Sequence, residues 1–424
     1  MKIQSVRGTR DFYPDEMALR NWLFEQWRAA SRRAGFVEVD GPVLEPLDLY
    51  TEKSGPEIAE QLYWLTDKGG RELALRPEFT PTLARMIAAR QAALPTPIRW
   101  FNISRCFRYE RAQRGRLREF FQWNVDLIGV EGEIADAECI SLAVDGLKAV
   151  GLGPEDVEIR VSDRRLLSAL VQTYVGVSED LVPSVFAILD KRDKVPAEAL
   201  AGMLDEAGLG NEERSRLERV LTFRDLGELD AIGSVQTPAE SLKRLFGLLA
   251  DYGIADWCRF DIGIVRGLAY YTGPVWEVYD RKGEFRAIFG GGRYDRLLGD
   301  VGGQSMPACG FACGDAVLGL LLKERGLGPP EGSETDYYVA AWNPDWPKVL
   351  QMVRHLRSRG KRVQFDLKGG KINRQSKNAI SSGARFVVVI GDKEAPWPKV
   401  LVRDLRQGTV SQPMEYRKVG DEGQ

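Results

Sequence analysis

Ten residues from Phe120 to Gly129, "FFQWNVDLIG", alternate in polarity so regularly that they restrict this part of the chain to a β-strand. Successive side chains of a strand point to opposite faces. The even-numbered residues share a mixed, largely polar face: Phe120, Gln122, Asn124 and Asp126. The odd-numbered residues share an apolar face: Phe121, Trp123, Val125 and Leu127. The pattern therefore predicts a strand with a hydrophobic core on one side and a polar surface on the other.

The residues before this strand predict its hairpin partner. Cys106, Arg108 and Glu110 alternate in the same way, and Gly115 permits a turn between the two segments. Counting from Arg105, six arginines fall within fourteen residues. A solvent-exposed polar face is the simplest interpretation of such a hairpin. However, an aromatic ring, an amide, a carboxylate and a guanidinium together suit a pocket for a nucleotide and a polar small molecule, and the clustered cations suit a triphosphate or a nucleic-acid end.

Three further segments contain candidate binding residues. In "LRPEFTPTLAR", Glu78 and Thr80 stand where a strand gives way to a helix, which suits an ammonium group, although a helix-capping role is equally consistent. In "VRGLAYYTG", Arg266, Tyr270 and Tyr271 lie beside two glycines and suit either a ligand site or an ordinary turn with core tyrosines. The segment "FGGGRYDRLLG" lacks the spacings of known phosphate-binding loops. Its glycines are expected to permit tight packing next to a pocket.

The order of predicted elements indicates two folded parts. Residues 1–325 predict an α+β domain with an antiparallel sheet and a mostly helical insertion at about 165–250, and residues 326–335 have the composition of a linker. In residues 336–424, strands alternate with helices, which predicts a small α/β domain with a mainly parallel sheet. Residues 331–424 contain 17 Lys and Arg against 11 Asp and Glu. A basic C-terminal part suggests a polyanionic partner, although a solvated charged surface explains it equally well.

Composition excludes several kinds of chemistry. The only histidine, His355, lies in a predicted surface helix, so a Ser-His-Asp triad or a histidine-based metal site is not expected. The five cysteines are scattered and odd in number, which indicates reduced thiols and a cytoplasmic location. No run of 18 apolar residues suggests a membrane span. We expect no metal ligands from protein side chains, so the chemistry must depend on arginine, carboxylates, tyrosine or a bound cation.

Taken together, these segments resemble the histidyl-tRNA synthetase family of class II aminoacyl-tRNA synthetases almost from end to end. The resemblance rests on "GTRDFYP", "GPVLEPLDLY", "LRPEFT", "FRYERAQRGRLREFFQ", "RGLAYYTG", "GGGRYDRL" and "GARFVVVIGD". It implies a catalytic domain, a C-terminal anticodon-binding domain, and a homodimer formed through "GPVLEPLDLY". The implied reaction uses ATP and Mg²⁺ to convert L-histidine to histidyl-adenylate, and then transfers histidine to tRNA(His).

The resemblance also implies roles for individual residues. Arg266 and Arg108 would be catalytic, on opposite sides of the α-phosphorus. Histidine would be bound by Glu78, Thr80, Arg108, Gln122, Asp126, Arg266, Tyr270, Tyr271 and Tyr294. ATP would be bound by Arg108, Glu110, Arg116 and Phe120. The tRNA would contact Arg111, Arg114 and Arg118 in the hairpin loop and Lys371 and Arg374 in the C-terminal domain.

The sequence departs from the family pattern at two places. Ala269 stands where many members carry Asp. The third class motif, which usually ends in Glu-Arg, reads "GFACGDAVL" with Asp315 and Ala316. The arginine that customarily clamps ATP is therefore missing, and γ-phosphate binding would depend on Arg116 or a neighbour.

Two other functions are compatible with parts of this pattern. One is a histidine-sensing regulatory subunit of ATP phosphoribosyltransferase without ligase activity. Such chains typically lack the C-terminal domain and lose the ATP-contacting arginines, whereas Arg108, Arg116 and Arg266 are all present here. The other is a sensor of uncharged tRNA, which would be expected within a longer regulatory chain.

Overall fold

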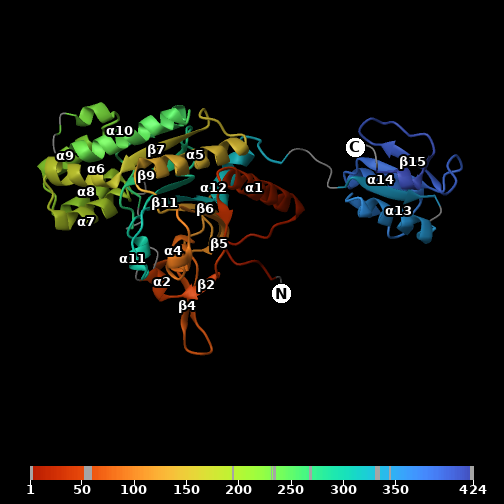
Figure 1. Cartoon of the computed structure of the whole chain (residues 1–424), viewed down its shortest axis with the longest axis horizontal. Coiled ribbons are helices and arrows are strands. Elements are labelled where there is room, and N and C mark those ends of the chain that lie inside the picture. Colours follow the sequence, from red (N-terminus) through yellow and green to blue (C-terminus); the bar gives the residue numbers. More distant parts are fainter. Residues whose placement is uncertain are drawn as a thin grey trace. The chain divides into compact units, whose positions relative to one another are not determined.

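The computed structural model describes residues 3–51, 60–192, 195–230, 232, 235–266, 270–329, 335–342 and 345–420. The chain divides into two compact units, residues 1–328 and 329–424, whose elements are labelled in Figure 1. The predicted linker, 326–335, spans this division, and its residues 330–334 lie outside the described residues.

The first unit is built on an eight-stranded sheet with the spatial order β1-β5-β6-β11-β10-β9-β7-β8. In that order the strands are Val37–Glu38, Ile98–Phe107, Glu119–Ile128, Ala308–Gly314, Phe289–Arg293, Pro274–Asp280, Val157–Asp163 and Cys258–Phe260. Only the two edge pairs, β1–β5 and β7–β8, are parallel. The predicted α+β class with an antiparallel sheet is confirmed, and β5 and β6 form the predicted hairpin.

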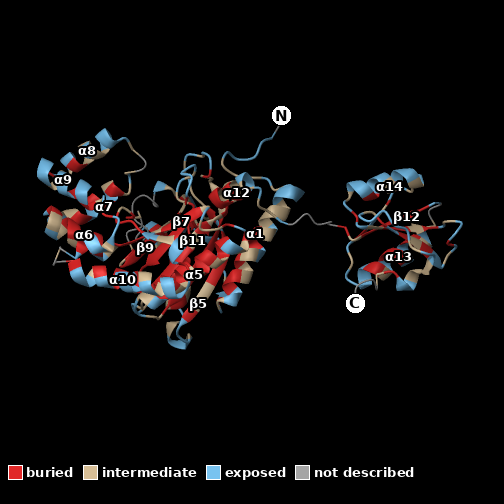
Figure 2. Cartoon of the chain, turned by 90° about the horizontal axis from the view of Figure 1, so that it is seen from above, coloured by how far each residue is buried: buried red, intermediate tan, exposed pale blue. Residues whose placement is uncertain are grey.

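One face of this sheet packs against helices and forms the main core (Figure 2). The helices are α1 (Pro14–Arg33), α5 (Glu133–Ala149), α10 (Gln236–Asp251) and α12 (Asp315–Glu324). Phe121, Trp123, Val125 and Leu127 of β6 all lie in this core, as the alternation predicts. Trp123 of β6 stacks on Trp27 of α1, with ring centroids 5.7 Å apart. The even-numbered residues of β6 therefore lie on the opposite side of the sheet.

That opposite side carries a smaller layer. It contains a three-stranded sheet with the order β2-β4-β3, formed by Leu44–Pro46, Glu72–Leu75 and Tyr63–Thr66. Its helices are α2 (Asp48–Thr51), α4 (Thr80–Ala88) and α11 (Leu297–Asp300). A second hydrophobic cluster joins Leu83 and Ile87 of α4 to Tyr271 and Tyr294. The tyrosines predicted for the site thus lie on the same side of the large sheet as the N-terminus of α4.

A helical segment connects β7 to β8. It comprises α6 (Arg164–Leu170), a π-helical turn (Val171–Val175), α7 (Val182–Leu189), α8 (Ala197–Glu206), α9 (Asn211–Val220) and α10. Short 3₁₀ turns occur at Gln91–Ala93, Glu179–Leu181, Leu226–Leu229, Ala255–Trp257 and Tyr416–Lys418. Buried leucines of α6, α9 and α10 extend the main core into this segment.

The second unit has a five-stranded sheet with the order β13-β12-β14-β15-β16. The strands are Val363–Phe365, Tyr337–Ala341, Phe386–Ile390, Lys399–Asp404 and Met414–Glu415, and the helices are α13 (Trp346–Ser358) and α14 (Ile372–Ser381). The first three strands are parallel, which confirms the predicted α/β class, and β15 and β16 add antiparallel strands at one edge. His355 is half-buried on α13, where its Nε2 lies 3.2 Å from the Val419 carbonyl oxygen.

Candidate active site

The polar face of the β5–β6 hairpin is buried. Gln122, Asn124 and Asp126 are 8%, 1% and 3% exposed. In the register of the hairpin, Gln122 lies opposite Ser104 and Asn124 lies opposite Asn102. A solvent-exposed face, the simplest interpretation of the alternation, is therefore wrong for these residues. Buried polar groups are costly unless they are paired or functional, so this face is the natural place to look for a site.

On the side of β6 away from β5, strands β11 and β10 contribute only glycine and alanine to this face. Gly310 of β11 lies opposite Asp126, and Gly290 of β10 lies opposite Ala312. A Cβ atom at Gly310 would lie 2.8 Å from Asp126 Oδ1, and one at Gly290 would overlap the Arg266 guanidinium and the Trp276 carbonyl oxygen. The glycines of "FGGGRYD" therefore permit close packing next to the site, as the sequence indicated.

We expect the Gly290→Ala substitution to displace Arg266 and to lower the activity of the site on the order of 100-fold, because a shift of about 1 Å in a positioning group has effects of that size. The measurement is the ATP–pyrophosphate exchange that the family resemblance implies. Gly247→Ala in α10 is the matched control, because nothing lies within 4 Å of a Cβ there. Similar activities of the two variants would show that Gly290 does not position Arg266.

One end of the polar face is lined by carboxylates and tyrosines. The Tyr294 hydroxyl donates a hydrogen bond to Asp126 Oδ1, and the Tyr270 hydroxyl donates to Glu78 Oε2 at 3.2 Å. Burial raises the pKa of Asp126 to about 7, although the Tyr294 hydrogen bond acts in the opposite direction. Burial, followed by the neighbouring carboxylate, raises the pKa of both Tyr270 and Tyr294, so both remain neutral donors. Together with Tyr271, whose ring centroid lies 5.1 Å from that of Tyr270, these groups form a buried cluster with donors and acceptors side by side.

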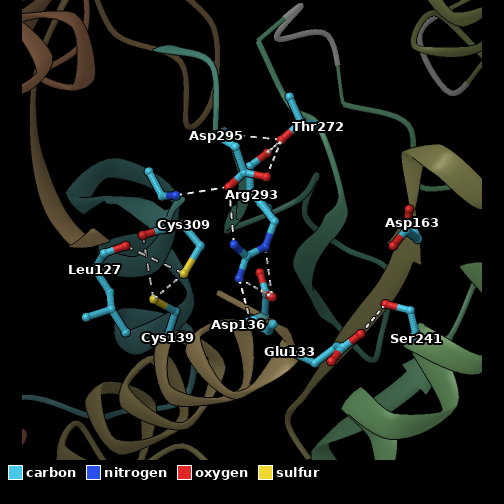
Figure 3. A network of polar contacts seen from close by, with 12 residues as sticks. Leu127, Glu133, Asp136, Cys139, Asp163, Ser241, Thr272, Arg293, Asp295 and Cys309 are labelled. Carbon is cyan, nitrogen blue, oxygen red and sulfur yellow. Dashed lines mark hydrogen bonds and ion pairs between the residues drawn. The ribbon is translucent and has the colours of Figure 1, made fainter. Parts of the chain in front are cut away.

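A partly buried polar network beside this cluster connects β10 to α5 (Figure 3). Arg293 pairs with Asp136 of α5 at 2.7 Å and with Asp295 at 3.2 Å. Asp295 in turn accepts hydrogen bonds from Thr272 and from the Ala308 backbone. Because Arg293 directly precedes Tyr294, this network fixes the backbone from which the Tyr294 hydroxyl reaches Asp126.

The other end of the face is lined by arginines. The Arg108 guanidinium lies 5.3 Å from the centre of the Phe120 ring, and its Nε donates to the Pro77 carbonyl oxygen at 3.0 Å. Arg116 Nε lies 2.9 Å from Glu110 Oε2. The predicted residues thus gather into an acidic, tyrosine-lined end and a basic end of one strand face.

Arg266 lies between these two ends. Its Nη1 donates to the Trp276 carbonyl oxygen at 3.3 Å, and its Nε lies 3.9 Å from Glu277 Oε1. Its φ of 53° is the only positive value at a non-glycine position in the described part of the chain. Such strained residues cost roughly 1–3 kcal/mol and cluster at functional sites. Ala269, one of the two departures from the family pattern, lies outside the described residues.

The arginines of the hairpin loop differ in their surroundings. Arg111 and Arg114 are exposed, and Arg114 lies 3.4 Å from Glu324 of α12. Arg118 is half-buried, with its guanidinium over the Tyr109 ring and its Nε donating to the Glu110 carbonyl oxygen. In the second unit, Lys371 and Arg374 are both exposed at the start of α14.

Two features of the site were not predicted from the sequence. Asp315, in the altered third motif, is buried, pairs with Arg10 at 2.7 Å and accepts a hydrogen bond from the Phe121 backbone. Asp315 therefore connects the start of α12 to the start of β6. Arg286, in the loop before β10, donates from Nη2 to the Gly115 carbonyl oxygen at 2.6 Å. No sequence signal marks Arg286, because the segment "KGEFRAIF" contains no motif.

Within the described ranges, no group of three or more His, Cys, Asp and Glu side chains is placed to hold a metal ion. No helix in the same ranges has the length and apolar character needed to cross a bilayer. The five cysteines are all free.

Comparisons with known proteins bear directly on this site. The model of the histidyl-tRNA synthetase family matches residues 8–315, and a model of an anticodon binding domain matches residues 343–421. The chloroplastic/mitochondrial histidine–tRNA ligase of Arabidopsis thaliana is 44% identical over 96% of this chain and 84% of its own length. The histidine–tRNA ligase of Opitutus terrae is 43% identical over 96% of this chain and 94% of its own length.

A solved structure shows the same fold. The histidyl-tRNA synthetase from Nostoc sp. PCC 7120 matches with a TM-score of 0.82 at 24% identity, covering 100% of this chain and 99% of that chain. The family match includes the buried strand face, the side chains at both of its ends and the glycine-lined strands beside them. The chain therefore belongs to the histidyl-tRNA synthetase family.

Proposed function

We propose that this chain is an ATP-dependent histidine–tRNA ligase, which converts L-histidine to histidyl-adenylate and transfers histidine to tRNA(His). The observation that carries this proposal is the buried strand face of β6. It presents the Asp126–Tyr294 pair at one end and the arginine cluster around Phe120 at the other. A small amino acid with a hydrogen-bonding ring and a nucleoside triphosphate would meet along this face.

The chemistry suits a site without a catalytic histidine. The attacking group is the histidine carboxylate, which is already ionised at neutral pH, so the step requires no general base. It requires alignment of the reactants and stabilisation of the charge that develops on the phosphate oxygens. Arg108 and Arg266 would supply this on opposite sides of the α-phosphorus.

The pocket residues would divide their roles between the two substrates. Glu78, Thr80 and Gln122 would bind the α-ammonium group, and Asp126, Tyr271 and Tyr294 would pair with the imidazole, with Tyr270 held beside them by Glu78. Phe120 would stack on adenine beside Glu110, and Arg116 would reach toward the β- and γ-phosphates.

Mg²⁺ would arrive with the triphosphate, whose oxygens this hard cation prefers as ligands. The two carboxylates next to the arginines are Glu110 and Glu277, and both lie within 4.0 Å of an arginine nitrogen. We therefore assign Mg²⁺ to the phosphate oxygens and not to protein side chains.

We further propose a homodimer in the cytoplasm. The apolar side chains of Val43, Leu44, Trp64 and Leu65, in and beside the small three-stranded sheet, are 39–59% exposed, which supports an interface there. The free cysteines support a reducing compartment. Light scattering of the full chain in solution tests the dimer, and a monomer would contradict it.

The test of the function is exchange of pyrophosphate into ATP with each of the twenty amino acids, without tRNA. Exchange with histidine alone is the expected result. If histidine binds by calorimetry but supports no exchange, the chain is a histidine-sensing relative, such as a regulatory subunit of ATP phosphoribosyltransferase, and the ligase proposal fails.

We expect charge reversal at Lys371 and Arg374 to weaken tRNA binding and to reduce its salt dependence by roughly one unit of slope for each phosphate that is no longer neutralised. Residues 351–377 contain nine Lys and Arg with Asp366 as the only acid, so this part of the second unit suits a polyanion. The measurement is tRNA(His) affinity as a function of salt. Charge reversal at the exposed Lys393 and Lys399 produces the same net charge and is the control. A loss of tRNA-independent exchange would contradict the assignment.

A further inference from the structure

The loop that precedes β10 is docked on the arginine hairpin. The Arg114 guanidinium lies 5.0 Å from the centre of the Phe285 ring, and Arg286 Nη2 donates to the Gly115 carbonyl oxygen at 2.6 Å. In the sheet, Phe289 pairs with Cys313, so this loop and the start of α12 lie at the same end of β10 and β11. Arg286 therefore reaches the hairpin from a loop outside the β5–β6 hairpin.

Charges of both signs surround Arg286, with Arg116 and Arg108 opposed by Glu110 and Glu277. Partial desolvation and the neighbouring Arg116, with a smaller contribution from Arg108, lower the pKa of Arg286 although its side chain reaches solvent. Both carboxylates already lie near other arginines, Glu110 at 2.9 Å from Arg116 and Glu277 at 3.9 Å from Arg266. Among the described residues, Arg286 makes no ion pair. A guanidinium presents five N–H donors, and the Gly115 contact leaves most of them available to an anion.

The first turn of α12 supplies no cation at this place. Asp315 pairs with Arg10, Ala316 is apolar, and Val317 is buried against the hairpin, 3.0 Å from a Cβ built at Gly115. The positive charge that faces the hairpin from this side therefore comes from Arg286.

We propose that Arg286 binds the β- and γ-phosphates of ATP, on the side of the triphosphate away from Arg116. The inference rests on the proposed function. It gives Arg286 the phosphate contact that an arginine of the third motif customarily makes and that this chain lacks. Arg108 and Arg116 of the hairpin and Arg286 of the loop would then surround an anion that carries several negative charges, an arrangement suited to bidentate contacts with phosphate oxygens.

The test compares Arg286→Ala, Arg286→Lys and Lys282→Ala in the full chain by histidine-dependent exchange without tRNA. Lys282 is an exposed cation in the same loop and is the matched control. We expect Arg286→Ala to raise the KM for ATP about 10- to 100-fold, the range for losing a charge-assisted hydrogen bond. The KM for histidine should change less than about twofold in Arg286→Ala. Arg286→Lys should restore part of the affinity for ATP, and Lys282→Ala should behave as wild type.

Binding of AMP separates phosphate recognition from support of the loop. AMP keeps the adenine and the α-phosphate, so calorimetry should show equal AMP affinity for wild type and Arg286→Ala. Equal losses for ATP and AMP would assign Arg286 to holding the hairpin and overturn the proposal. So would an unchanged KM for ATP, or a defect confined to transfer to tRNA. If the wild-type chain shows no exchange, the ligase proposal fails separately, and calorimetry with ATP and AMP still decides the role of Arg286.

Discussion

The Asp126→Ala substitution will raise the KM for histidine roughly 10²- to 10³-fold and leave the KM for ATP nearly unchanged, because it leaves two buried hydrogen-bonding groups unpaired at a cost of about 1–3 kcal/mol each. Asp126 is 3% exposed and accepts a hydrogen bond from Tyr294. Without it, the Tyr294 hydroxyl and one imidazole nitrogen would both lose an acceptor inside the pocket. Exchange kinetics at varied histidine and ATP measure the two constants. An equal rise in both would remove Asp126 from the imidazole site.

The pH dependence of the KM for histidine provides a second test of the role of Asp126. Because the pKa of Asp126 is raised to about 7 by burial, the ionised acceptor is lost as the pH falls through about 7. The KM for histidine should therefore rise between pH 8 and pH 6 more steeply in the wild type than in Asp126→Asn. Titration of free histidine affects both proteins alike, so the difference between their pH profiles measures the ionisation of Asp126. An equally steep rise of the KM in the wild type and in Asp126→Asn would contradict the role of Asp126 in binding the imidazole.

The same pKa shift has the opposite effect on the stability of the ligand-free protein. The folded state binds this proton more tightly than the unfolded chain does. The contribution of Asp126 to stability is therefore fully present below about pH 4, the ordinary Asp value, and it is lost as the pH rises through about 7. Histidine binding would favour the ionised form and partly offset that loss.

Replacing Arg266 with Ala will lower kcat for adenylate formation about 10²- to 10³-fold, the effect of removing one preorganised group that stabilises developing charge. The KM values for histidine and ATP should change much less, because the interaction strengthens in the transition state. Arg266 is held by the Trp276 carbonyl oxygen and lies near Glu277, so its guanidinium is already oriented before substrates arrive.

Two further variants test whether the loss of rate is specific to the Arg266 guanidinium. Arg266→Lys keeps the charge but loses the planar fork of donors, so it should recover only part of the rate. Arg281→Ala removes an exposed arginine from the end of the neighbouring strand β9 and should leave the rate unchanged. Single-turnover measurement of adenylate formation gives the rate directly. A wild-type rate for Arg266→Ala would exclude a catalytic role.

The local pattern of the sequence predicted the framework of the site. The alternation from Phe120 to Leu127 predicted both the strand and its two faces, because side-chain direction in a strand depends only on position along the chain. Gly115 marked the turn, and the quoted motifs predicted the family, which the comparisons confirm. Alternation states only that two faces differ, however, and it cannot show what covers each of them. The burial of Gln122, Asn124 and Asp126 therefore became visible only in the folded chain.

The tertiary structure decided the contacts between segments that are distant in sequence. Gly310 lies opposite Asp126 and Gly290 lies next to Arg266 through the register of β6, β11, β10 and β9. Arg286 reaches Gly115 across 171 positions of the chain, and Asp315 reaches Arg10 across 305. Local periodicity and motif spacing contain no information about such pairs, because strand order and register are set by packing of the whole sheet. The sequence by itself thus determined the strand faces, the turn and the family, and only the folded chain showed that Arg286 lies against the arginine hairpin.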